Sequence, residues 1–135
     1  MDLVALEDRL REFEPVLFAL LFGSRAAGSE RADSDWDLGV YLRPELSGRR
    51  RLGLRLELEA RLADLGPLDV VPLNDAPPLL AQRALQGKRL LVRDPVAYVR
   101  FFVRSEALAG DEVHWRQLHR DSRERRLREG GFGRP

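Results

Sequence analysis

The sequence contains no cysteine, no isoleucine and no threonine, and Lys88 is its only lysine. Without cysteine, both disulfide bonds and thiolate zinc sites are excluded. Apolar runs are also short, because the longest, residues 15–22, falls far below the length that crosses a bilayer. The N-terminus is amphipathic and acidic and has no signal-peptide core, so we expect a cytoplasmic protein that does not enter membranes. The missing residue types indicate a GC-rich genome rather than a function.

Several common enzyme signatures are absent as well. The sequence has no GxxxxGK-type phosphate loop, no glycine-rich dinucleotide fingerprint and no Ser-His-Asp order. Its 23 basic and 22 acidic residues leave a formal net charge of +1, which gives no reason to expect nucleic acid as a partner.

At 135 residues the chain suits one domain with a real core. We expect this domain over residues 1–129, followed by a flexible tail at residues 130–135.

The apolar periodicity predicts an α/β (α+β) fold, with a small mixed sheet of about four strands covered by helices. Helices are expected at residues 2–13, 49–65, 76–85 and 94–128, the last with a break at Gly110. Strands are expected at residues 16–22, 38–42, 68–73 and 89–92. Residues 52–58 alternate as a strand would, but leucine, glutamate and arginine favour a helix there. A short link between the first two strands predicts an antiparallel pair, and a helical crossover to the third predicts a parallel pair.

The most informative stretch lies between residues 17 and 42. Its first strand ends at Gly23 and Ser24, and after ten intervening residues Asp35 and Asp37 open the second strand. Side chains two apart in a strand point from the same face, so the two carboxylates point together and favour a divalent cation between them. Gly23 lets the backbone approach a ligand closely, and a helix that begins at Ser24 offers an anion site. Antiparallel pairing brings the two halves together, as a metal-nucleotide complex requires.

This layout resembles the DNA polymerase β-like nucleotidyltransferases, whose signature is Gly-Ser, a spacer of similar length and Asp-x-Asp. Within them it is most similar to the minimal nucleotidyltransferases, which in prokaryotes are often paired with a HEPN-domain toxin. The matching residues are Gly23, Ser24, Arg25, Ala26, Gly28, Ser34, Asp35, Asp37 and Leu38. The resemblance implies a polymerase β-like nucleotidyltransferase fold and a third carboxylate near the start of the third strand.

Asp69 is the matching position for that third carboxylate. A parallel third strand starts at the same edge of the sheet as the second, which brings Asp69 beside the other two acids. Asp64, on the preceding helix, and Asp75, in the following loop, are the alternatives. The resemblance implies that Asp35, Asp37 and Asp69 hold Mg²⁺ and carry the catalysis, with carboxylate ligands that favour a hard cation over zinc.

By the same resemblance, Gly23 and Ser24 hold the β- and γ-phosphates of ATP or another nucleoside triphosphate, and Arg25 flanks them. The implied reaction is attack of a hydroxyl on the α-phosphorus with release of pyrophosphate. The implied acceptor is a tyrosine of a HEPN toxin, which the chain neutralises as an antitoxin by attaching AMP. Three alternatives stay open: a module that binds nucleotide or toxin without turnover, an antibiotic-modifying nucleotidyltransferase, and a small nucleic-acid binder that uses Arg49 to Arg51 and the arginine-rich tail.

Overall fold

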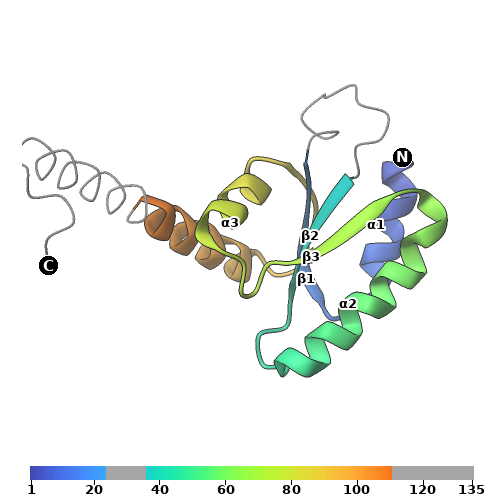
Figure 1. The fold of residues 1–135 in the computed structure, drawn as a ribbon, viewed down its shortest axis with the longest axis horizontal. Coiled ribbons are helices and arrows are strands. Elements are labelled where there is room, and N and C mark those ends of the chain that lie inside the picture. Colours follow the sequence, from blue (N-terminus) through green and yellow to red (C-terminus); the bar gives the residue numbers. More distant parts are fainter. Residues whose placement is uncertain (24–35, 111–135) are drawn as a thin grey trace, which may run out of the picture.

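Four strands form the centre of the molecule. The computed structural model describes residues 1–23 and 36–110 (Figure 1). The strands are β1 (Val16–Phe22), β2 (Trp36–Leu42), β3 (Leu68–Pro72) and β4 (Lys88–Val92), in the order β3-β2-β1-β4 across the sheet. β1 pairs antiparallel with β2 and β4, and β2 pairs parallel with β3. The predicted mixed sheet, the antiparallel β1–β2 pair and the parallel β2–β3 pair are therefore confirmed, and the pairing of β4 with β1 is a new finding.

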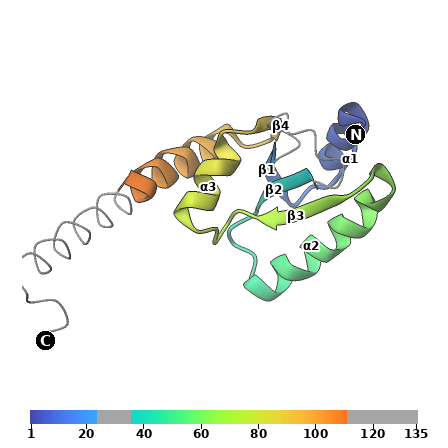
Figure 2. The same cartoon turned by 45° about the horizontal axis from the view of Figure 1, so that its top comes forward.

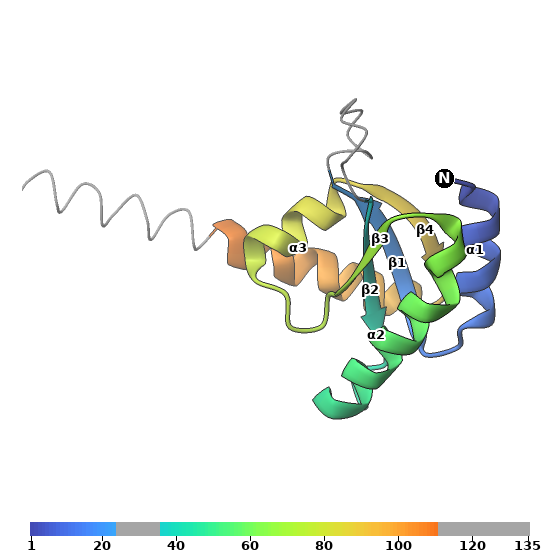
Figure 3. The ribbon, with the colours of Figure 1, turned by 45° about the vertical axis from the view of Figure 1, so that its right-hand side comes forward.

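Helices cover both faces of this sheet. α1 (Leu3–Glu12) and α2 (Gly48–Leu62) lie on one face, and α3 (Pro78–Leu85) and the helical residues 95–110 lie on the other (Figure 1, Figure 2 and Figure 3). A short 3-10 turn, η1 (Ala63–Leu65), follows α2. No helix within the described ranges is long and apolar enough to span a membrane.

Alternate residues of β2 face the two helical layers. Leu38 and Val40 pack into the cluster that holds the buried leucines of α1 and α2. Tyr41 belongs to the opposite cluster, and a side chain at Gly39 would touch Leu73 of that cluster. Because side chains alternate along a strand, Asp37, Gly39 and Tyr41 share the face on which α3 lies.

β1 is buried along its whole length, as the absence of alternation in its sequence predicts. Helices cover both of its faces, and β2 and β4 flank both of its edges. On the α3 side, the ring of Phe18 stacks on Tyr41 with 4.9 Å between the ring centroids. The rings of Tyr98 and Phe101, from the helical residues 95–110, also contact Phe18, each with 5.3 Å between ring centroids. This aromatic cluster fixes the last helix against the sheet.

Local signals in the sequence explain where the helices begin and end. Asp2 accepts a hydrogen bond from the backbone N–H of Ala5 at 3.1 Å, which caps α1. Ser47 caps α2 in the same way by accepting from the N–H of Arg50. Gly66 ends η1 with a φ of +120°, a conformation that glycine adopts without strain. α2 itself ends at Leu62, three residues earlier than predicted.

The helical residues 95–110 differ from the prediction in the side chains that they expose. Apolar periodicity over residues 94–128 predicts a buried face, yet the members of that face within the described range are largely exposed: Val96, Val99, Phe102, Val103 and Leu108. The buried side carries Ser105 and Ala109 instead, together with the partly buried aromatic residues of the cluster. Gly110 is still helical, and the positions predicted beyond it lie outside the described residues.

An ion pair between Arg9 and Asp64 should make the fold sensitive to acid. Nη2 of Arg9 donates to Oδ2 of Asp64 at 2.8 Å, and this hydrogen bonding, more than the charge of Arg9, holds the pKa of Asp64 below its usual range. A carboxylate with a lowered pKa in the folded state stabilises the fold above its unfolded pKa of about 4, and this contribution is lost as the pH falls through the folded pKa. Asp64→Asn should therefore lower the urea midpoint at pH 7, and the difference from the unaltered chain should shrink below about pH 4.

The matched control for this prediction is Asp8→Asn on α1. Asp8 is exposed and pairs with Arg11 at 3.5 Å across one helical turn. Pairs of this kind contribute little to stability, so the control should follow the unaltered chain throughout the pH series. The prediction would be contradicted if the urea midpoint of Asp64→Asn lay below that of the unaltered chain by the same amount at pH 7 and at pH 3.

Candidate active site

Two acidic side chains lie side by side where β2 and β3 begin. Asp37 pairs with Asp69 across the parallel ladder and with Phe22 across the antiparallel one. Directly paired residues on neighbouring strands project from the same face, about 5 Å apart. The register therefore brings both carboxylates to the same end and the same face of the sheet.

Gly23 adjoins these carboxylates from the end of β1. Its φ of +100° lies in a region that side chains rarely adopt. A methyl group at this position would lie 3.2 Å from Cγ of Asp37 and closer still to its Oδ2. The absence of a side chain at Gly23 thus makes the room that the Asp37 carboxylate occupies beside the backbone.

Asp69 is open to solvent and has a cationic neighbour. Its side chain is 56% exposed, and Nη2 of Arg55 on α2 lies 3.9 Å from its Oδ1. Arg55 also approaches Glu59, with 3.4 Å between Nε and Oε1. Exposed pairs of this kind contribute at most about 1 kcal/mol, so Asp69 remains available to a ligand. The sequence gives no signal for the contact with Arg55, because the i,i+4 spacing to Glu59 already accounts for an arginine at that position.

The two carboxylates suit a hard divalent cation. Their oxygens are ligands that Mg²⁺ prefers, and two like charges in register are stabilised when a cation neutralises them. Among residues 1–23 and 36–110 there is no group of three or more acids or histidines that could hold a metal. Asp35, which is predicted to hold the metal together with Asp37 and Asp69, lies outside the described residues. Asp37 and Asp69, at the end of the sheet where the Gly23 backbone adjoins them, fit a magnesium ion that carries an anionic ligand.

Half of the predicted site residues belong to the part of the chain that the structure describes. Those three converge at one end of the sheet: Gly23, Asp37 and Asp69. The other three lie outside the described residues: Ser24, Arg25 and Asp35.

The alternatives for the third carboxylate are engaged elsewhere. Asp64 accepts hydrogen bonds from Arg9 of α1. Asp75 pairs with Arg51 of α2 at 3.0 Å. Arg51 also donates to the carbonyl of Leu46, and its side chain is only 18% exposed.

The family model described as polymerase beta, nucleotidyltransferase matches residues 5–96. This stretch includes all four strands, α2, α3 and the two paired aspartates. The chain belongs to the polymerase beta nucleotidyltransferase family. The fold and family predicted from Gly-Ser and Asp-x-Asp are therefore confirmed, and the chain is a nucleotidyltransferase.

Solved toxin–antitoxin complexes contain chains that are similar to this nucleotidyltransferase. In a toxin–antitoxin structure with AMP-PNP, the similar chain is 25% identical with a TM-score of 0.68, over 90% of this chain and 98% of that one. A second similar chain comes from a complex of a tri-AMPylated HEPN toxin with an MNT antitoxin from Shewanella oneidensis. It is 22% identical with a TM-score of 0.62, over 89% of this chain and 97% of that one. No curated protein sequence matches the nucleotidyltransferase.

Proposed function

We propose that this nucleotidyltransferase transfers AMP from ATP to a tyrosine hydroxyl of a HEPN-domain toxin and acts as its antitoxin. The observation that carries the proposal is the convergence of Gly23, Asp37 and Asp69 at one end of the sheet. Two similar structures support it, since one was solved with AMP-PNP and the other contains a tri-AMPylated HEPN toxin.

On the nucleotide side, Asp37 and Asp35 hold a magnesium ion together with the triphosphate of ATP. Bound Mg²⁺ neutralises the phosphate charge and polarises the α-phosphate. Gly23 lets the phosphates approach the backbone closely, because it has no side chain. Ser24 and Arg25 follow directly in the sequence and bind the β- and γ-phosphates through N–H groups, the hydroxyl and the guanidinium.

On the acceptor side, Asp69 receives the proton of the tyrosine hydroxyl. Its carboxylate is more than half exposed, so an acceptor reaches it from solvent. The tyrosine oxygen forms a bond to the α-phosphorus while the bond from that phosphorus to the bridging oxygen of the β-phosphate breaks. Pyrophosphate leaves, and AMP remains on the tyrosine.

The proposal is tested with the purified chain, Mg²⁺, radiolabelled ATP and a HEPN-domain protein that co-purifies with the chain, which we name the cognate toxin. We expect label on the cognate toxin only when all components are present, and mass spectrometry should locate AMP on a tyrosine. Replacement of that tyrosine by phenylalanine should remove the label. A cognate toxin that binds the chain yet stays unlabelled with every nucleotide and metal would indicate a binding module without turnover and would contradict the proposal.

A further inference from the structure

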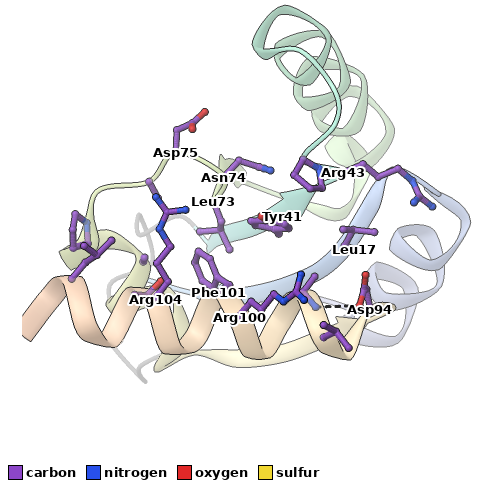
Figure 4. Close-up of a pocket in the computed structure, with 18 of the residues that line it drawn as sticks. Leu17, Tyr41, Arg43, Leu73, Asn74, Asp75, Asp94, Arg100, Phe101 and Arg104 are labelled. Carbon is purple, nitrogen blue, oxygen red and sulfur yellow. Dashed lines mark hydrogen bonds between the residues drawn. The ribbon is translucent and has the colours of Figure 1, made fainter.

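Figure 4 shows a groove beside Tyr41 of β2. Tyr41 shares a face of the sheet with Asp37 and lies toward the opposite end of β2. The volume of the groove is about 740 Å³. Apolar side chains line it from both sides: Tyr41 from β2 and Leu73, the residue after β3, on one side, and Phe101 from the helical residues 95–110 on the other. Asp37 and Tyr41 are four residues apart on one strand, so about 13 Å separates the groove from the candidate active site.

The helical residues 95–110 expose an apolar strip beside this groove. Val96, Val99 and Val103 recur at helical spacing, and Phe102 flanks them. Val99 and Val103 are 56% and 60% exposed, and neither lines the groove. Valine is a weak helix former, so helix stability does not account for three valines on an exposed face. A continuous exposed apolar strip is typical of a protein interaction surface.

Two arginines lie between the strip and the groove. Arg100 and Arg104 line the groove from the helix, and within the described residues neither side chain forms an ion pair or a hydrogen bond. Of the acids on the groove walls, Asp75 is paired with an arginine of α2, and Asp94 accepts a capping hydrogen bond from the N–H of the helix's first turn. Glu45 is exposed on the loop after β2. A partner that supplies carboxylates would complement the two arginines.

We propose that the groove and the strip of Val96, Val99 and Val103 dock an amphipathic helix of the cognate toxin. Its apolar side fills the groove and covers the strip, and its carboxylates pair with Arg100 and Arg104. The inference rests on the proposed function, which names the toxin as the partner. A small ligand would occupy the cavity alone, whereas the exposed apolar side chains continue beyond it along the helix. A partner helix with apolar residues at i, i+3, i+4 and i+7 covers the groove and the strip at the same time.

An exposed leucine pair on α2 is the alternative docking surface. Leu52 and Leu56 lie one helical turn apart and are about as exposed as the valine strip. However, α2 packs against Leu38 and Val40, on the face of the sheet opposite to Asp37. A toxin held on α2 would have to bring its hydroxyl around the edge of the sheet. A toxin held in the groove meets Asp37 on the same face, at a distance well below the diameter of a small domain.

The test measures the affinity of the full chain for the cognate toxin by isothermal titration calorimetry, without nucleotide. Val99→Gln with Val103→Gln should weaken binding about tenfold or more, because it removes the apolar contacts. Arg100→Glu with Arg104→Glu should do the same, and the affinity of the unaltered chain should fall as salt is added. All four side chains are exposed, so circular dichroism and thermal unfolding should show an intact fold.

The matched control is Leu52→Gln with Leu56→Gln, which should bind the toxin as the unaltered chain does. Loss of binding in this control with full binding in both groove variants would overturn the proposal. So would light scattering that shows loss of self-association in the groove variants at unchanged toxin affinity, because the strip would then join two copies of the chain. Binding that depends on the groove, with no labelling under any condition, would support the docking surface and contradict AMP transfer. If the groove variants bind and label the toxin as the unaltered chain does, the result would support AMP transfer and contradict the docking surface.

Discussion

Replacing Asp37 by asparagine should abolish AMP transfer to the cognate toxin, with a rate at least about 10³-fold lower. Asparagine keeps the shape of the side chain but removes the negative charge and the hard oxygen pair that binds Mg²⁺. Asp37 lies at the centre of the site, in register with Asp69 and against Gly23. The loss should appear in single-turnover labelling with radiolabelled ATP at saturating Mg²⁺, where it reports transition-state stabilisation rather than binding.

The matched control is Glu57→Gln on α2. Glu57 is an exposed acid that pairs with Arg61 at 2.8 Å, on the other face of the sheet from Asp37. This control should label the toxin at the unaltered rate. The Asp37→Asn variant should still bind the toxin, because the groove lies at the opposite end of β2. Labelling by Asp37→Asn within a few-fold of the unaltered chain would contradict the assignment of Asp37.

The sheet and the meeting of its acids could be predicted from local features of the sequence. Pro15 and Gly23 bound an apolar run without alternation, and β1 fills the space between them. A helical crossover requires a parallel third strand, which brings the start of β3 beside the start of β2. The connection predicts that the two strand starts meet, and the structure adds the register, which pairs Asp37 directly with Asp69. Backbone direction and side-chain alternation are short-range properties, so they can be inferred from one sequence.

Contacts between distant elements could not be predicted in this way. The approach of Arg55 to Asp69 depends on how α2 crosses the edge of the sheet. The groove depends on how the helical residues 95–110 leave β4, and apolar periodicity alone places Val99 and Val103 on a buried face. The structure instead buries the aromatic side of that helix, because Phe18 and Tyr41 offer a matching surface there. Packing of this kind is decided by the shapes of both partners, which a single sequence does not specify.

Gly23→Ala should lower AMP transfer by about 10²-fold or more while the chain stays folded. The new methyl group would meet the carboxylate of Asp37, whose Cγ and Oδ2 already occupy that space. The carboxylate or the backbone must move, and a shift of about 1 Å in a positioning group costs roughly 10² in rate. The φ of +100° adds about 1 kcal/mol of backbone strain for any residue with a Cβ. Single-turnover labelling measures the first effect, and thermal unfolding measures the second.

Gly66→Ala is the matched control, because it separates backbone strain from the clash. Gly66 has a φ of +120°, but nothing lies within 4 Å of an added Cβ. The control should therefore lose a similar amount of thermal stability and still label the toxin at the unaltered rate. Equal loss of labelling in both variants would mean that strain alone explains the effect, and the proposed role of Gly23 would be wrong. A loss confined to Gly23→Ala would assign the effect to the displaced Asp37 carboxylate, as expected when that carboxylate must stay in place beside the backbone at the end of β1 to hold the metal that carries ATP.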